Sequence, residues 1–162
     1  MNGRRARIVV SAIVATLVVA GCSSDDGGAR LSKAQYIAKA DQICRDANQK
    51  TAALAPPTSS DPQVLATFLG KSGQIISDAA GKLKKLKPPA ADEKKINQLI
   101  DGLQASARLF PPLIKAVKAQ DTQRIQELAA QLRQTSLQGS QIAQNYGFHV
   151  CAHASSAATP SP

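Results

Sequence analysis

Apolar residues recur every three or four positions along four stretches of the chain, which is the spacing of helices that bury one face. The first stretch begins at Ser32, where Ser32 and Gln35 have the spacing of a capping box, and the proline pair at 56–57 ends it. The second begins at Asp61, and the proline pair at 88–89 ends it. This pattern predicts two amphipathic helices in the first half of the chain.

The third stretch begins after Asp92 and contains the proline pair at 111–112. Because its apolar spacing stays in phase across these prolines, the pattern predicts one kinked helix and not two helices. The fourth stretch begins at Asp121, and Gly147 follows it as a C-cap. Four helices with short connections predict an all-α fold, an up-down-up-down four-helix bundle.

The composition agrees with a small helical protein. The chain has 162 residues, which allows one modest domain with tails. Aromatic residues make up 3% and there is no Trp, which argues against a β-sandwich or barrel. The formal charge of +9 comes from 20 Lys and Arg against 11 Asp and Glu.

The first residues have the features of a targeting segment. Arginines within residues 4–7 precede an apolar run over residues 8–20, which is too short to span about 30 Å of hydrocarbon as a helix. The run ends in Val19-Ala20-Gly21-Cys22. This sequence resembles the lipobox of bacterial lipoproteins, in which small residues precede a cysteine that receives a diacylglyceryl group.

The resemblance implies that Cys22 is lipidated and becomes the first residue of the mature chain, on the extracytoplasmic face of the cell membrane. Two acyl chains are enough for stable anchoring. We therefore expect a signal peptide over residues 1–21, a flexible tether over 22–31, the bundle over 32–153 and a disordered tail over 154–162. The alternative is an ordinary secreted protein with a chance cysteine near its cleavage site.

The three cysteines can then be assigned. Lipidation accounts for Cys22, and in an oxidising compartment Cys44 and Cys151 are predicted to form a disulfide. For Cys151 to reach Cys44, the segment after the fourth helix must turn back. We expect Phe148 and Val150 to pack between the first and fourth helices, with the intervening histidine facing outward.

Three short sequences extend the resemblance beyond the lipobox. They are Ala40-Asp41-Gln42-Ile43-Cys44, Lys87-Pro88-Pro89 and Gly147-Phe148-His149-Val150-Cys151. They look like a layout found in small helical lipoproteins of actinobacteria, which are mostly uncharacterised. The resemblance implies the helical fold and no particular activity.

Catalytic and cofactor motifs are absent from the sequence. It contains no G-x-S-x-G elbow, Walker loop, G-x-G-x-x-G or H-E-x-x-H motif, so we expect no enzyme activity and no cofactor. His149, Cys151 and His153 alternate and could share a metal, but they need a fourth ligand and compete with the disulfide. We therefore expect no metal site and keep metal binding as an alternative.

Lysines gather in the turn between the second and third predicted helices. This lysine cluster consists of Lys82, Lys84, Lys85, Lys87, Lys94 and Lys95. The bundle topology places the turn at the membrane-proximal end, where anionic headgroups could attract it. The alternative is a solvated helix end, with lysines placed favourably for the helix dipole. Nucleic acid is not an expected partner outside the cell.

Two further features bear on binding. Small or helix-weakening residues lie at a similar height in the predicted bundle, and they either line a ligand pocket or let the helices approach closely: Ala47, Ser72, Gly73, Pro111 and Thr135.

The fourth helix carries a nearly uncharged glutamine face, a candidate partner surface: Gln120, Gln123, Gln126, Gln131, Gln134, Gln138, Gln141 and Gln144.

Taken together, these patterns favour a lipid-anchored, non-enzymatic binding or scaffolding module, with a cell-envelope protein as a candidate partner. A carrier of a small apolar ligand in the bundle core is the first alternative, and a metal-binding lipoprotein is the second.

Overall fold

The computed structural model describes residues 29–153, and within this part the chain is all-helical, without a β-strand. The predicted signal peptide, most of the tether and the predicted tail lie outside the described residues. The helices are α1 (Lys33–Ala52), α2 (Pro62–Lys85), η1 (Ala90–Asp92), α3 (Glu93–Lys118), α4 (Thr122–Tyr146) and η2 (Cys151–His153). The prediction of an all-α fold is confirmed.

The helices begin where the polar cap residues predicted. Ser32 accepts a hydrogen bond from the Gln35 N–H, and the Gln35 side chain accepts one from the Ser32 N–H, completing a capping box. Asp61 and Asp121 accept hydrogen bonds from the first turns of α2 and α4. Gly147 ends α4 with a φ of 104°, a left-handed conformation that glycine adopts without steric cost.

The third helix is continuous. Pro111 and Pro112 both lie inside α3, which extends without interruption from Glu93 to Lys118. Each proline lacks an N–H and so removes one backbone hydrogen bond from the helix. Buried apolar side chains occur on α3 both before and after the prolines, and they belong to two different core clusters.

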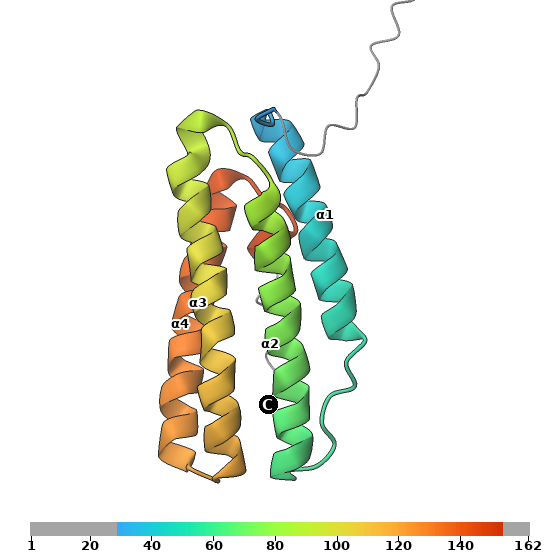
Figure 1. Cartoon of the computed structure of the whole chain (residues 1–162), viewed down its shortest axis with the longest axis vertical. Helices are drawn as coiled ribbons and strands as arrows, with labels where there is room; N and C mark the ends of the chain where they lie inside the picture. Colours follow the sequence, from blue (N-terminus) through green and yellow to red (C-terminus); the bar gives the residue numbers. More distant parts are fainter. Residues whose placement is uncertain (1–28, 154–162) are drawn as a thin grey trace, which may run out of the picture.

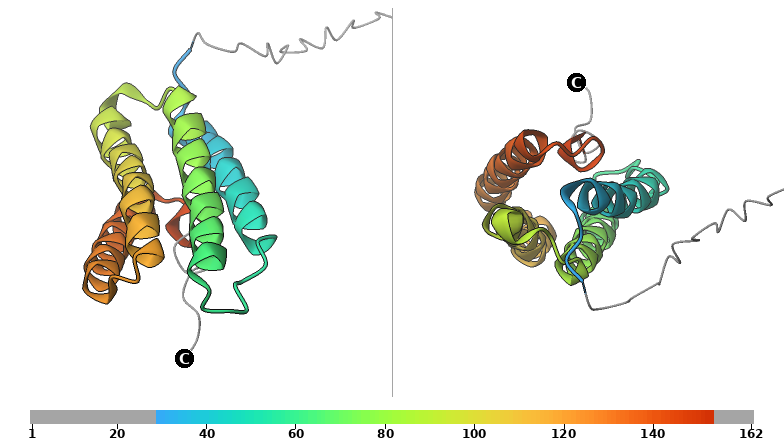
Figure 2. Two further views of the ribbon diagram at one scale, coloured as in Figure 1. Left: turned by 60° about the horizontal axis from the view of Figure 1, so that its bottom comes forward. Right: turned by 90° about the horizontal axis from the view of Figure 1, so that it is seen from above.

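The helices lie side by side, with α2 and α3 in the middle, α1 beside α2, and α4 beside α3 (Figure 1). Seen from above, the four helices form a ring in which the C-terminal segment lies between α4 and α1 (Figure 2, right). The Leu31 N–H donates to the Lys87 carbonyl, and the Tyr146 hydroxyl donates to Asp92. These bonds place the start of α1, the α2–α3 turn and the end of α4 at one end of the molecule.

The core consists of two clusters. The cluster near the α2–α3 turn includes side chains from all four α-helices and from the C-terminal segment: Tyr36, Ala40, Leu83, Ile96, Leu99, Ile100, Ala143, Tyr146, Phe148 and Ala152. The second cluster, towards the opposite end, is built around buried side chains of α3 and α4: Leu113, Ala116, Val117 and Leu128. Half-buried leucines of α2 pack on this second cluster, and α1 contributes none of its members. Thus α1 joins the common core only near the α2–α3 turn.

Candidate functional site

The C-terminal segment, residues 148–153, is attached covalently to α1. Cys44 and Cys151 form a disulfide with their Cα atoms 5.2 Å apart, across 107 positions of sequence. The predicted pairing is therefore confirmed. We call residues 148–153 the C-terminal clasp, because they join the end of α4 to the middle of α1.

The clasp buries its first side chain as predicted. Phe148 is 4% exposed and lies between Tyr36 of α1 and Tyr146 of α4, with ring centroids 6.2 Å and 5.0 Å away. Val150 is half-buried and His149 is exposed. The aromatic side chains fill the space that separates α1 from α4 at this end.

A buried carboxylate of α1 holds the clasp by its backbone. Asp41 is 5% exposed, and its Oδ2 accepts the His149 N–H at 3.0 Å, while its Oδ1 accepts the Val150 and Cys151 N–H groups at 2.9 and 3.0 Å. These contacts satisfy three consecutive N–H groups, two just before the short helix η2 and one at its first residue, and the positive end of these peptide dipoles suits a carboxylate. Asp41 therefore fixes the direction in which the clasp turns back.

The sequence interpretation missed this role of Asp41. The signal was its position three residues before Cys44, which places both side chains on the same face of α1. A residue on that face meets whatever segment brings Cys151 to Cys44. The sequence interpretation used Asp41 only as part of the stretch from Ala40 to Cys44 that carries the resemblance.

Both tyrosines of the chain are buried beside the clasp. Burial raises the pKa of Tyr36 to about 12. Burial also raises the pKa of Tyr146 well above its ordinary value, and the hydrogen bond that its hydroxyl donates to Asp92 at 2.9 Å adds to this effect. The Lys33 ammonium lies 4.7 Å from the centre of the Tyr146 ring, on the solvent side of the cluster.

The two histidines of the clasp have no free cysteine thiolate beside them with which to bind a metal ion. His149 and His153 are exposed, and the Cys151 sulfur between them is bonded to Cys44. Among residues 29–153, no three His, Cys, Asp or Glu side chains are grouped closely enough to hold a metal ion. The geometry of the clasp is that of a structural connection.

The five residues predicted to line a pocket do not share one site. Gly73 is buried against Phe110 of α3, and a Cβ at position 73 would lie 2.8 Å from the Phe110 ring. The Ser72 hydroxyl donates to the Phe68 carbonyl, and the Thr135 hydroxyl donates to the Gln131 carbonyl, both within their own helices. At Gly73, the small residue therefore allows close approach of α2 and α3.

Two open grooves lie on the surface of the described domain. A groove of about 550 Å³ between α2 and α3 includes Gly73 and Pro111 in its lining, but not Ala47, Ser72 or Thr135. A second, of about 460 Å³, lies under the loop after α1, next to the start of α2.

The structure brings the lysine cluster together with the start of the domain. All six lysines are exposed on α2, the α2–α3 turn and the first turn of α3. Arg30, which the sequence assigned to the tether, donates to the Pro88 carbonyl at 3.1 Å and forms an ion pair of 2.8 Å with Glu93. The folded domain therefore begins before Ser32, because Arg30 and Leu31 already contact the α2–α3 turn and the start of α3.

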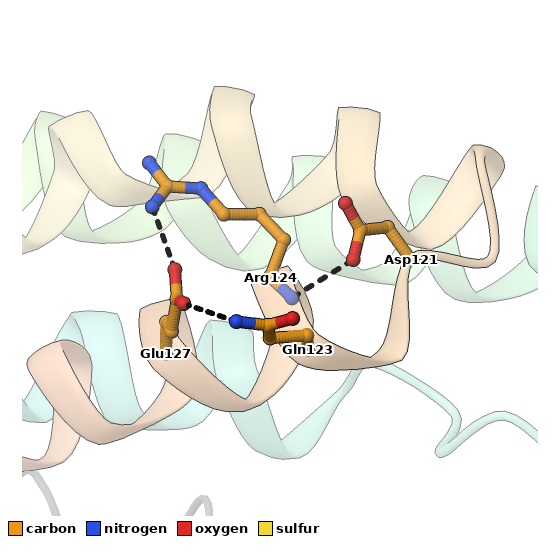
Figure 3. A network of polar contacts seen from close by, with 4 residues as sticks. All are labelled: Asp121, Gln123, Arg124 and Glu127. Atoms are coloured by element: carbon orange, nitrogen blue, oxygen red, sulfur yellow. Dashed lines mark hydrogen bonds and ion pairs between the residues drawn. The ribbon is translucent and has the colours of Figure 1, made fainter.

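The charges of α4 are confined to its first half. At its start, Arg124 donates to Glu127 at 2.9 Å, Gln123 donates to the same carboxylate, and Asp121 caps the helix (Figure 3). After Arg133, α4 contains no charged residue. Leu137, in this second half, is 59% exposed. The glutamines of the glutamine face are all exposed as well, so the outer face of the second half of α4 is a solvent-facing, uncharged surface.

Comparisons of this chain with models of protein families, with curated proteins and with solved structures find no match. Within residues 29–153, no helix combines the length and the apolar character required to cross a membrane.

Proposed function

We propose that this protein is a lipid-anchored, non-enzymatic binding or scaffolding module on the outer face of the cytoplasmic membrane, attached through Cys22. The disulfide between Cys44 and Cys151 is the observation that carries the proposal. Disulfides form and persist in exported proteins and are rare in the cytosol. A disulfide-linked domain that directly follows a lipobox-like sequence is consistent with export and retention at the membrane.

The second half of α4 is the surface proposed for a protein partner. It is exposed and uncharged, and Leu137 stands out from it. Partner surfaces are depleted in charge at their centre, since charged groups are costly to desolvate. Its lack of charge and its exposed leucine favour a cell-envelope protein partner there.

The absence of enzyme activity is part of the proposal and rests on how the reactive groups are used. The Asp41 carboxylate accepts three backbone N–H groups, and Cys151 is in a disulfide. Neither group is therefore available as a base or a nucleophile. We do not extend the proposal to a carrier of apolar ligands, because the five residues predicted to line its pocket do not line one common cavity.

The proposed architecture is an up-down-up-down bundle whose third helix bends at its prolines. The hydrogen bonds from Leu31 to Lys87 and from Tyr146 to Asp92 support the alternation, since each joins the start of one helix to the end of another. The two N–H groups missing at Pro111 and Pro112 supply the physical cause of a bend.

Metabolic labelling with a clickable fatty acid in the native host tests the anchor. The wild-type chain and a Ser24→Ala control should both incorporate the label, whereas Cys22→Ser should incorporate none, because it lacks the thiol that accepts the lipid. Equal labelling of Cys22→Ser, or no label on the wild type, would refute the anchor.

A further inference from the structure

The end of the domain at the α2–α3 turn carries a strong and unbalanced positive charge. The six lysines of the lysine cluster are exposed there, together with Lys33 at the start of α1. The nearby carboxylates are already engaged, since Glu93 pairs with Arg30 and Asp92 accepts the Tyr146 hydroxyl. Within residues 29–153, no salt bridge joins Lys82, Lys84, Lys85, Lys94 or Lys95 to a carboxylate.

The opposite end of the domain has mixed charge. Lys115 and Lys118 are exposed in the last turn of α3. The chain that follows α3 supplies Asp121, which caps α4, and Glu127, which pairs with Arg124, so cations and carboxylates are interspersed at this end. The two ends therefore differ in charge, because near the α2–α3 turn the basic residues clearly outnumber the two neighbouring carboxylates, Asp92 and Glu93.

The chain enters the domain at the lysine cluster. Leu31 is hydrogen-bonded to the Lys87 carbonyl, and Arg30 is bonded to Pro88 and Glu93. From Cys22 to residue 29 the chain can extend at most about 25 Å. Because α3 has 26 residues, it is about 39 Å long. An inverted domain, with its opposite end on the membrane, would need a longer tether than the sequence provides.

We propose that the lysine cluster binds the anionic lipid headgroups of the bilayer in which Cys22 is anchored, so that the domain stands with its α2–α3 turn on the membrane. This inference rests on the lipid anchor proposed above. The tether keeps the cluster at high effective concentration near the headgroups, and each lysine close to an anionic surface increases binding by about fivefold. In the same orientation the uncharged half of α4 is the half of that helix closer to the membrane, so its proposed partner is a protein at or near the membrane surface.

Amine labelling of the full mature protein in vesicles tests the orientation. The protein is reconstituted in vesicles containing phosphatidylglycerol, or in vesicles of phosphatidylcholine alone, and labelled to low conversion so that few charges are lost. Mass spectrometry then reports each lysine. The lysine cluster should label severalfold more slowly in the anionic vesicles, whereas Lys115 and Lys118 should label equally in both. High salt should remove the protection, because the screening length falls from about 8 Å at physiological ionic strength to about 3 Å at 1 M salt.

Two double variants provide a matched comparison. Lys84→Glu with Lys85→Glu reverses two charges in the last turn of α2, and Lys115→Glu with Lys118→Glu does the same in the last turn of α3. Both pairs are exposed and both perturb a helix C-terminus equally. In the anchored protein, the first variant should lower the equilibrium constant for headgroup contact by at least about 25-fold, read from the protection of the remaining lysines of the cluster, and the second should lower it by far less.

The outcomes separate the two proposals. Equal labelling of the lysine cluster in both vesicle types, or equal effects of the two double variants, would overturn the headgroup contact. Stronger protection by a soluble anionic glycan than by anionic vesicles would also overturn it, in favour of an envelope polymer. The intact mass of the same sample reports the lipid on Cys22 independently. If the lipid is missing, the comparison is repeated with vesicles in excess, and selective protection would still support the surface.

Discussion

Replacement of Asp41 tests the account of the C-terminal clasp. Asp41 accepts three backbone N–H groups, two at Oδ1 and one at Oδ2, and it is almost fully buried. In Asp41→Asn the amide keeps one oxygen, which can accept two of these donors, but its NH₂ group faces the third. Since a hydrogen bond to a charged group contributes about 1.5–3 kcal/mol, this variant should lose roughly that amount of unfolding free energy.

Asp41→Ala removes all three acceptor contacts and should cost more. Each buried N–H group left without an acceptor costs about 1–3 kcal/mol, so the loss is a large part of the 5–15 kcal/mol typical of a whole domain. The disulfide limits the effect by keeping the clasp close to α1. Because His149 lies at the surface, water can also replace part of the lost bonding there.

The measurement is urea unfolding with the disulfide intact, followed by helical circular dichroism. Amide hydrogen exchange at His149, Val150 and Cys151 provides a local readout. Asp46→Asn is the matched control, because Asp46 lies on the same helix and accepts a bond only from the neighbouring Gln42 side chain. It should change stability by no more than about 0.5 kcal/mol. If both Asn variants have the same stability and the same exchange rates, the carboxylate does not hold the clasp.

Three further predictions follow from the packing. Gly73→Ala should destabilise the domain by about 1–3 kcal/mol, since its methyl group overlaps a Phe ring, whereas Gly81→Ala on the same helix has open space and should stabilise it by about 0.5–1 kcal/mol in thermal unfolding. The raised pKa of Tyr36 means that folding keeps its hydroxyl protonated, so this contribution to stability is complete below pH 10 and is lost as the pH rises through about 12. Absorbance at 295 nm should show delayed tyrosine ionisation in the folded protein, and titration at the ordinary value would contradict it. Replacing Cys44 and Cys151 together with Ala should cost about 4–5 kcal/mol in the chain-entropy model, and an unchanged urea midpoint would contradict it.

The local features of the fold were readable from the sequence. Ser32, Asp61 and Asp121 cap helices because their side chains satisfy backbone N–H groups a few residues away, and this chemistry depends only on nearby sequence. The disulfide was readable because the lipidation expected of Cys22 leaves the other two cysteines as a pair. Burial of Phe148 then followed, because the segment had to cross the space between α1 and α4 to reach Cys44.

Features that depend on three-dimensional neighbours were not readable. The predicted layer of small residues required all four helices to meet at one height, but α1 contributes to the core only near the α2–α3 turn. Ala47 and Thr135 therefore line neither of the two grooves described above. The role of Asp41 depends on where the clasp turns, which is set by long-range contacts and not by residues beside it in the chain.

The central claim is the lipid anchor, and the intact mass of the protein extracted from its own membrane tests it most directly. We predict a chain that begins at Cys22, lacks residues 1–21, carries a diacylglyceryl group and retains the disulfide between Cys44 and Cys151. A chain that carries no lipid mass, whether or not residues 1–21 have been removed, would contradict the claim.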